Sequence, residues 1–284
     1  MYRITDKRIL NPTVVQLQVE APLVARKAKP GQFIILRVDE EGERIPLTVA
    51  GTDPMAGTVK IIFQVVGATT KQLSTKKAGD SLQDFVGPLG TATRLEGLKR
   101  VCIVGGGVGC AIAMPIAQAL HEMGAEVTSI IGFRSRDLLI LEEEFCACSD
   151  RLRIMTDDGS YGEHGNVTLP LKEMLEAGET FDEIIAIGPL VMMKYVVATA
   201  KPFGTPVTVS MNPVMIDGTG MCGGCRLTLN QNGTKVTKFA CVDGPDFNGY
   251  EVDFDEAMSR SRMYADFERH AFESACNLLN KEAD

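Results

Sequence analysis

The pattern of hydrophobic residues changes near residue 100, and this change requires two parts of different architecture. Before it, apolar and polar residues alternate in TVVQLQVE (13–20) and TVKIIFQVV (58–66), a pattern typical of half-buried β-strands. After it, the continuous apolar run VCIVGGG (101–107) ends in glycines and precedes a helical pattern and a new strand, EVTSIIGF (126–133). The order predicts a β-domain followed by a domain of alternating strands and helices.

Four segments follow from this pattern. Gly- and Pro-rich turns between short strands predict a small antiparallel β-barrel over residues 1–97. Alternating strands and helices predict a parallel-sheet α/β domain, covered on both faces, over residues 98–211. Residues 212–250 lose this periodicity and become rich in Gly and Cys, whereas residues 251–284 have a mainly helical pattern. More than one domain is expected for a chain of 284 residues.

Charge and hydropathy argue against two classes of protein. The net charge of −8, from 29 basic and 37 acidic residues, disfavours a nucleic-acid-binding surface. No apolar stretch reaches the roughly 20 residues of a membrane span, and the opening MYRITDKRILNP lacks the apolar core of a signal peptide. We therefore expect a cytoplasmic protein that binds neither nucleic acid nor membrane. In that compartment the eight cysteines are expected to be reduced, so a tight group of them indicates metal or redox chemistry.

One such group lies in the segments MIDGTGMCGGC and FACVDG. Asp217 is followed by Cys222, Cys225 and Cys241 with gaps of four, two and fifteen residues, the spacing of plant-type [2Fe–2S] sites with Asp at the first position. The intervening glycines permit the tight turns that aim backbone amides at sulfur. A structural zinc with the same ligands and three reduced thiols without metal are the alternatives. The spacing favours an iron–sulfur cluster, in which a hard carboxylate makes Asp217 the unusual ligand.

A glycine-rich loop joins the strand that begins at Val101 to the following helix. Helix N-terminal amides and the helix dipole make such a loop suited to a pyrophosphate. The glycines of the loop are Gly105, Gly106, Gly107 and Gly109. The match to G-x-G-x-x-G is imperfect, since Cys110 stands where the third glycine is expected, so a simple tight turn is the alternative.

Charged residues after two of the strands bear on the choice between NADH and NADPH. Arg134 and Arg136 follow the second strand of the α/β domain, and Asp157 and Asp158 follow the third in TDDGSYG. An Arg favours the 2′-phosphate of NADPH, whereas an acid favours the free 2′-hydroxyl of NADH. Solvated charge is the alternative for both pairs.

With these parts in this order, the chain resembles the ferredoxin–NADP reductase superfamily, in the branch that carries a C-terminal [2Fe–2S] segment. That branch contains electron-transfer subunits of dihydroorotate dehydrogenase, small subunits of sulfide dehydrogenase, and small subunits of electron-bifurcating NADH-dependent ferredoxin:NADP oxidoreductases. The segment DGTGMCGGC resembles the last group, with Asp217 where the dihydroorotate dehydrogenase subunit has Cys. The resemblance covers essentially the whole chain.

The resemblance implies a flavin site on the barrel. RIPLT (44–48) resembles the superfamily's flavin-binding motif, in a version that contains Pro and lacks the aromatic residue. It implies that Arg44 pairs with the FAD pyrophosphate and that Thr48 lies by the flavin ring. Pro46 and Leu47 would then shape the pocket. Taken alone, RIPLT also fits a strand with an edge proline.

The resemblance extends to a second FAD element and to the nucleotide loops. VGATTKQL implies that Gly67, Thr69 and Thr70 present amides and hydroxyls to phosphate, whereas a capped helix start is the alternative. GGGVG, TDDGSYG and the Gly-Pro pair at Gly188 resemble the family's nicotinamide nucleotide loops. Asp157 and Asp158 are thereby included among the candidate nucleotide-binding residues.

The implied activity is electron transfer. Hydride from NADH, with NADPH as the alternative, would reduce FAD, and single electrons would leave through the [2Fe–2S] cluster. The resemblance implies a heterodimer with a larger subunit that carries a second flavin and [4Fe–4S] clusters and that meets ferredoxin and NADP in flavin-based bifurcation. An electron-transfer subunit of dihydroorotate or sulfide dehydrogenase is the first alternative, and a non-catalytic iron–sulfur or zinc module that regulates a partner is the second. We expect no acid–base catalytic residue.

Overall fold

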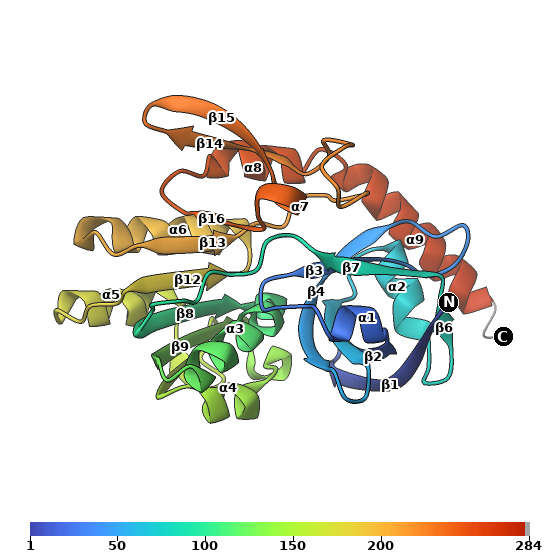
Figure 1. Ribbon diagram of the computed structural model, residues 1–284, viewed down its shortest axis with the longest axis horizontal. Coiled ribbons are helices and arrows are strands. Elements are labelled where there is room, and N and C mark those ends of the chain that lie inside the picture. Colours follow the sequence, from blue (N-terminus) through green and yellow to red (C-terminus); the bar gives the residue numbers. More distant parts are fainter. Residues whose placement is uncertain (282–284) are drawn as a thin grey trace.

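The computed structural model describes residues 1–281, in which a barrel lies beside a parallel sheet (Figure 1). The first sheet is antiparallel and has the strand order β6-β1-β2-β5-β4-β3-β7. Its strands are β1 (Tyr2–Asn11), β2 (Val14–Glu20), β3 (Phe33–Arg37), β4 (Ile45–Asp53), β5 (Thr58–Gln64), β6 (Ser81–Leu82) and β7 (Asp84–Leu89), with the helices α1 (Pro22–Ala25) and α2 (Ala68–Thr75) between them. Only Gln83 separates the two outermost strands, so the edges of the sheet come together. This confirms the predicted antiparallel barrel.

The second sheet is parallel, apart from its last strand. Its order is β11-β10-β9-β8-β12-β13-β16, and β16 runs antiparallel to β13. Its strands are β8 (Arg100–Gly106), β9 (Glu126–Phe133), β10 (Arg151–Thr156), β11 (Glu163–His164), β12 (Glu183–Ile187), β13 (Val207–Ser210) and β16 (Asp246–Asn248). The predicted parallel sheet is thus confirmed, and its edge is extended by a strand from the Gly- and Cys-rich segment.

Helices cover both faces of this sheet. Val101 and Ile103 pack in one core with α3 (Cys110–Glu122) and α4 (Glu142–Cys148), whereas Cys102 and Val104 pack in another with α5 (Thr168–Glu176) and α6 (Leu190–Ala200). Short 3₁₀ turns are η1 (Gly107–Gly109), η2 (Arg136–Leu138) and η3 (Lys201–Phe203). The sequence did not predict α4. Within residues 1–281 we find no helix whose length and hydropathy suit a membrane crossing.

The C-terminal part consists of a hairpin and three helices. Its elements are β14 (Arg226–Gln231), β15 (Thr234–Phe239), α7 (Ala240–Asp243), α8 (Phe254–Ser261) and α9 (Ala265–Lys281). Asn232 and Gly233, with φ of 50° and 80°, form the two-residue turn of the hairpin, as Asn-Gly pairs commonly do. The helix α9 runs back across the molecule and packs against α2 of the barrel (Figure 1).

One hydrophobic core joins all of these parts. It contains Phe33 and Ile35 from the barrel, Cys225 and Cys241 from the cysteine segment, and Phe247 from β16, together with the α5 and α6 face of the parallel sheet. The cysteine segment is therefore packed into the protein at the junction of barrel and sheet.

Candidate functional site

The parallel sheet has a switch point between β8 and β12. From β8 the chain proceeds to β9 and β10 on one side, and it later returns to β12 and β13 on the other. Ligands of open α/β sheets bind in the crevice at the carboxyl ends of such strands. Gly105 and Gly106 are the last two residues of β8, Gly107 and Gly109 lie in η1 directly after it, and Gly188 follows β12. The structure therefore brings these glycines together at the expected place.

Close packing accounts for three of the glycines. A Cβ atom at Gly109 would lie 2.4 Å from the carbonyl oxygen of Ile187, and one at Gly106 would lie 2.4 Å from the sulfur of Met192. A Cβ atom at Gly188 would lie 3.2 Å from the Cα atom of Gly106. The two loops thus touch backbone to backbone at Gly109, where a side chain would separate them, whereas at Gly106 and Gly188 the nearest atoms belong to the flexible side chain of Met192.

The remaining two glycines of the loop differ from each other. A Cβ atom at Gly105 would meet the sulfur of Cys110 at 2.9 Å. Gly107 has a φ of +55° and open space around its missing side chain. Gly107 is thus the point at which a ligand can approach the backbone before α3 begins.

The acidic pair after β10 is exposed, and one member has a structural role. The amides of Asp157 and Asp158 donate to the carbonyl oxygens of Phe133 and Arg134 at 3.0 and 3.2 Å, which holds this loop beside the end of β9. One carboxylate oxygen of Asp158 accepts from the hydroxyl and the amide of Ser160, and these bonds lower the pKa of Asp158. Asp157 has no such bond in the described structure, so its carboxylate is free to meet a ribose hydroxyl.

Arg136 lies beside the same loop. Its guanidinium carbon is 5.2 Å from the ring centre of Tyr161, a cation–π distance, and its amide donates to the hydroxyl of Ser160 at 2.8 Å. The Tyr161 hydroxyl donates to Glu142 at 2.7 Å. Arg136 is therefore held against a ring at the carboxyl edge of the sheet, next to the acidic pair.

The predicted flavin strand has one open side. Thr48 and Pro46 of β4 pair with Phe33 and Ile35 of β3, whereas pairing of β4 with β5 begins only at Val49. Proline lacks an amide proton, and on this half-paired stretch that loss costs no bond to β5. Residues 45–48 are half-buried and Arg44 is exposed. Both interpretations of RIPLT, an edge strand and a flavin-binding surface, fit this geometry.

The start of α2 lies against the residue before Arg44. The hydroxyl of Thr70 accepts from the amide of Gly67 at 3.0 Å and donates to the carbonyl oxygen of Gly67 at 2.9 Å. The hydroxyl of Thr69 donates to the carboxylate of Glu43 at 3.0 Å. The structure thus brings the two predicted FAD elements together, and it uses the Thr70 hydroxyl as a helix cap. The open amides at the start of α2 are suited to a phosphate.

The first half of the predicted cluster site is a carboxylate-centred turn. One oxygen of Asp217 accepts from the amide of Thr219 and the other from the amide of Cys222, both at 2.8 Å, and these bonds lower the pKa of Asp217. The amide of Gly224 lies 3.4 Å from the sulfur of Cys222. Asp217 is half-buried and Cys222 is exposed. A carboxylate has lone pairs beyond those two bonds, so the turn leaves Asp217 able to act as a ligand.

The second half is a buried pair of thiols. The sulfurs of Cys225 and Cys241 are 3.2 Å apart, and the amide of Cys241 donates to the sulfur of Cys225 at 3.5 Å. Their exposures are 1% and 3%. Burial, and then the neighbouring Cys225 thiol, raise the pKa of Cys241 to about 12. A metal bound here must therefore displace a firmly held proton.

The loop between these pairs is shaped by glycines. Gly218 and Gly220 have φ of +74° and +82°, and Cβ atoms there would lie 2.6 Å from Leu89 and 2.8 Å from Val242. No three His, Cys, Asp or Glu side chains in the described part of the chain lie close enough to hold a single metal ion. Two pairs of donors, each with an amide aimed at sulfur, fit a binuclear cluster in which each iron takes two protein ligands.

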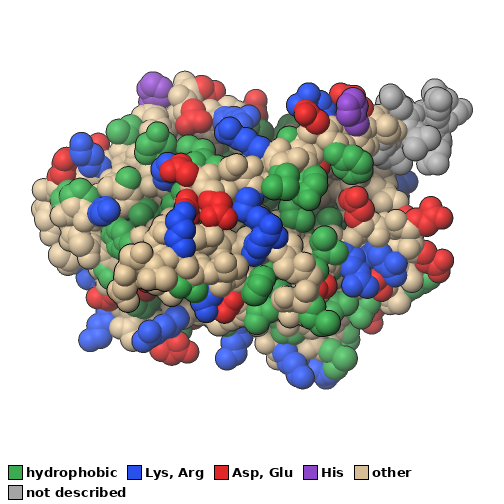
Figure 2. All heavy atoms as spheres, turned by 90° about the horizontal axis from the view of Figure 1, so that it is seen from above, with side chains coloured by type: hydrophobic (Ala, Val, Ile, Leu, Met, Phe, Trp, Pro, Cys, Tyr) green, Lys and Arg blue, Asp and Glu red, His purple; other side chains and the backbone are tan. Residues whose placement is uncertain are grey.

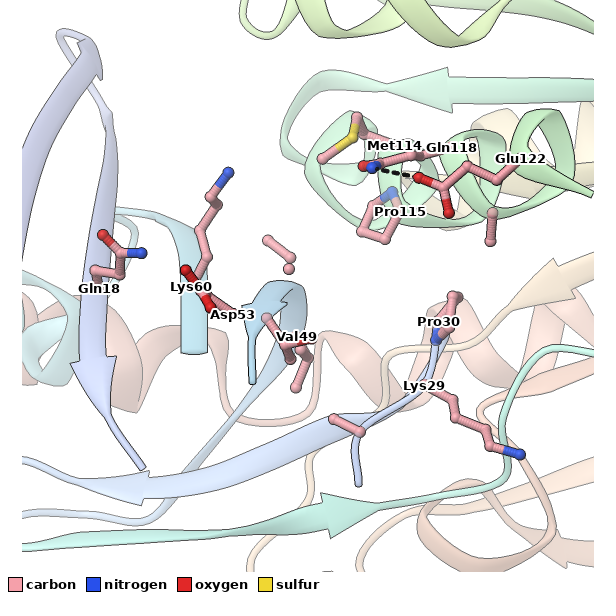
Figure 3. A pocket seen from close by; sticks show the side chains of 15 residues that line it. Gln18, Lys29, Pro30, Val49, Asp53, Lys60, Met114, Pro115, Gln118 and Glu122 are labelled. Atoms are coloured by element: carbon pink, nitrogen blue, oxygen red, sulfur yellow. Dashed lines mark hydrogen bonds between the residues drawn. The ribbon is translucent and has the colours of Figure 1, made fainter. Parts of the chain in front are cut away.

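A cavity of about 560 Å³ lies elsewhere, between the barrel and α3 (Figure 3). Its walls are β4, β5 and the outer side of α3, where Gln118 donates to Glu122 at 2.9 Å. None of the predicted cofactor residues within residues 1–281 lines it. The cavity is thus separate from both the switch point and the cysteine segment.

Taken together, the barrel, the switch point and the cysteine segment define a reductase of the ferredoxin reductase-like fold with an added iron–sulfur segment. Residues 212–253 match the family model for the iron–sulfur cluster binding domain of dihydroorotate dehydrogenase B. The chain is 46% identical to a Thermotoga maritima homologue of the dihydroorotate dehydrogenase B (NAD(+)) electron-transfer subunit, over 92% of this chain and 90% of the homologue. The Enterococcus faecalis electron-transfer subunit is 32% identical, over 89% and 97%.

The chain belongs to the family of dihydroorotate dehydrogenase B electron-transfer subunits and their homologues. Among solved structures it is similar to one from a study of flavin-based electron bifurcation by NADH-dependent reduced ferredoxin–NADP oxidoreductase. The TM-score is 0.89 and the identity 43%, with 96% of this chain and 97% of the other covered. The resemblance predicted from the sequence is confirmed.

Proposed function

We propose that this chain is an electron-transfer subunit that accepts hydride from NADH on FAD and passes single electrons through a [2Fe–2S] cluster to a larger partner. One observation carries the proposal. Cys225 and Cys241 share a core with Phe33 and Ile35 of β3, and β3 pairs directly with the predicted flavin strand β4. A cluster held there would lie one strand away from the flavin surface.

The chain's own residues bind and orient the cofactors. FAD, when bound, supplies the conversion between two-electron and one-electron transfer. For FAD, Arg44 provides a fork of donors to a pyrophosphate, and Thr48 faces the ring, where Pro46 and Leu47 shape the pocket. Phosphate oxygens would be held by the α2 start, that is Gly67, Thr69 and Thr70. The cluster would be held by Asp217, Cys222, Cys225 and Cys241.

The nicotinamide nucleotide is proposed to bind at the switch point, with its pyrophosphate at the start of α3. The loop residues are Gly105, Gly106, Gly107, Gly109 and Gly188. We assign the ribose side to Asp157 and Asp158, which favours NADH over NADPH. Asp157 is the member of the acidic pair whose carboxylate is free in the described structure.

The proposed partner is a larger subunit with a second flavin and [4Fe–4S] clusters, which forms a heterodimer with this chain and exchanges electrons with ferredoxin and NADP. The support is the likeness to the bifurcating oxidoreductase structure. Apolar side chains also surround the exposed half of the cluster site, since Met221 is 89% exposed and Ile216 and Val242 are each 51% exposed. On the face seen from above, where β14, β15 and α8 lie in Figure 1, hydrophobic and charged side chains are interspersed (Figure 2). The proposal includes a cytoplasmic location, where the thiols stay reduced.

A second candidate is the electron-transfer subunit of a dihydroorotate dehydrogenase, which would serve a different partner. The observation that favours it is the match of residues 212–253 to that enzyme's cluster-binding domain. The partner decides between the two candidates, so the large subunit that co-purifies with the native chain is to be identified by mass spectrometry.

The cofactor assignment has its own experiment. The chain is purified without oxygen and its flavin, iron, acid-labile sulfide and zinc are measured, after which NADH and NADPH are titrated separately. We expect one FAD and one [2Fe–2S] cluster per chain, and flavin reduction at lower concentrations of NADH than of NADPH. Stoichiometric zinc without sulfide would refute the cluster, and preferential reduction by NADPH would refute the nucleotide assignment.

A further inference from the structure

A buried carboxyl group lies where the linker between β7 and β8, residues 90–99, meets the edge of the parallel sheet. Asp246 of β16 faces a cavity of about 300 Å³ that is also lined by Thr93 and Arg94 of the linker and by Glu183 of β12. The Oδ1 atom of Asp246 is shielded from solvent and has no hydrogen-bond partner in residues 1–281. Buried polar atoms are rarely left in this way without a reason.

On one side, Asp246 holds the linker and, through it, the barrel. The Thr93 hydroxyl donates to Oδ2 of Asp246 at 2.5 Å, and the Thr93 amide donates to the carbonyl oxygen of Pro30 at 3.0 Å. Gly31 has a φ of +85°, and a Cβ atom there would lie 2.1 Å from the Thr93 hydroxyl. The barrel loop is thus fitted against the same hydroxyl that binds Asp246.

On the other side, Asp246 belongs to the chain that leaves the cluster site. Asp246 lies five positions after Cys241 in the chain. Asp246 pairs with Ser210 at the end of β13, the amide of Met211 donates to the carbonyl oxygen of Pro245, and the amide of Thr91 donates to that of Gly244. The carboxyl group of Asp246 thus binds the segment that contains Thr93, and the backbone of residues 244–246 joins that segment and the nucleotide-binding sheet to the cluster segment.

The charges around Asp246 make this contact sensitive to protonation. Burial, and to a smaller extent the carboxylate of Glu183, raise the pKa of Asp246 above its ordinary value of 3.8. Glu183 accepts from the hydroxyl of Thr208, and Arg94 and Asp243 line the same cavity. Because the pKa is raised in the folded chain, the stability contributed by this group is present below about pH 4 and is lost as the pH rises through the folded-state pKa.

We propose that Asp246 is a positioning residue, whose contact with Thr93 fixes the cluster segment against the barrel and thereby sets the geometry of electron transfer from flavin to cluster. The inference rests on the proposed function, because it concerns the passage of electrons between those two cofactors. It assigns Asp246 and Thr93 no contact with either cofactor.

The test uses matched variants of the full chain. Thr93→Val removes the hydroxyl and keeps the branched shape, whereas Thr93→Ser keeps the hydroxyl. Asp246→Ala removes the carboxyl, whereas Asp246→Asn keeps its shape and an acceptor for Thr93 but cannot ionise. Rapid mixing with NADH follows flavin reduction by absorbance, and rapid freezing follows cluster reduction by electron paramagnetic resonance. Hydrogen exchange of the Thr91 and Met211 amides is measured separately.

For Thr93→Val and Asp246→Ala we expect flavin reduction within about twofold of the wild type and cluster reduction slower by about tenfold, since small misplacements of reacting groups are costly. Both amides should exchange about tenfold faster in these two variants, in line with the loss of one hydrogen bond. Thr93→Ser should resemble the wild type. Asp246→Asn should also transfer electrons normally. In this variant the protection of the Thr91 and Met211 amides, relative to their intrinsic exchange rates, should lack the pH dependence of the wild type.

The outcomes distinguish a failure of the proposed function from a failure of the positioning role of Asp246. If NADH fails to reduce the flavin of the wild-type chain, the proposed function is wrong. If NADH reduces every variant alike and both cluster reduction and amide exchange are also unchanged in Thr93→Val, the positioning role of Asp246 is wrong. Equal loss in Thr93→Val and Thr93→Ser would likewise overturn it, because the hydroxyl would then not be the cause.

Discussion

The backbone contact between the two nucleotide loops predicts the effect of Gly109→Ala. Gly109 has a φ of −58° and a ψ of −23°, so its conformation alone suits alanine and would favour the variant by about 0.4–1 kcal/mol. The added Cβ atom, however, would lie 2.4 Å from the carbonyl oxygen of Ile187 and 2.8 Å from the Cα atom of Gly188. Both neighbours are backbone atoms, so the start of α3 must move away from the end of β12 by about 1 Å to reach an ordinary contact.

We expect two measurable results from this displacement. Overpacking of this kind costs about 1–3 kcal/mol, which lowers Tm by roughly 2–4 °C for each kcal/mol. A displacement of about 1 Å in the pyrophosphate loop also lowers the rate of flavin reduction by NADH by up to about 100-fold. Tm is measured by calorimetry, and the rate is measured by anaerobic rapid mixing over a range of NADH concentrations.

A matched control separates stability from binding. Gly124 ends the turn after α3, has a φ of +83° and has no atom near its missing side chain. Gly124→Ala is therefore expected to cost about 1–2 kcal/mol through backbone strain alone, with the NADH reaction unchanged. The predicted displacement is contradicted if Gly109→Ala keeps the wild-type Tm and the wild-type response to NADH, or if both variants impair the NADH reaction equally.

Three further predictions concern the other sites. Thr70→Val should lower stability by about 1 kcal/mol and weaken FAD retention, whereas Thr70→Ser should do neither, as a thermal melt and flavin content after gel filtration would show. Arg44→Lys should weaken FAD binding by about tenfold despite the retained charge, because a bidentate fork is lost; unchanged affinity in a fluorescence titration would contradict this. In the cluster-free chain, a maleimide should label exposed Cys222 and Cys146 far faster than buried Cys225, and of the two exposed thiols Cys222 alone should become protected when the cluster is restored.

Periodicity predicted the parts of the fold that local sequence determines. The alternating run that ends at Glu20 and the continuous run that begins at Val101 are both strands in the structure. Burial on one face of a strand produces alternation of apolar and polar residues, and burial on both faces produces a continuous apolar run. The helix α4 was missed since its seven residues, EEEFCAC, are too few to show a helical period. The hairpin β14–β15 was also missed, although its Asn232-Gly233 turn was a usable signal.

Tertiary contacts explain what the sequence could not predict. The contact between Thr93 and Asp246 joins residues 153 positions apart, so no local sequence pattern predicts it. The glycines at 106, 109 and 188 have a packing role that appears only when β8 and β12 are placed side by side. The cofactor residues were assigned from short motifs, and these assignments stay predictions.

The two halves of the cluster site differ in environment, and the difference gives the proposed electron path a direction. Cys225 and Cys241 are buried in the core that contains Phe33 of the flavin-side strand β3, whereas Asp217 is half-buried and Cys222 is exposed. Electrons from the barrel would therefore enter at the thiol pair and leave at the pair that contains the carboxylate. With Asp217 as a ligand, the replacement of a thiolate would fall on the proposed exit side. It would change the half of the cluster that we propose a partner meets, and it would leave the buried half with two sulfur ligands.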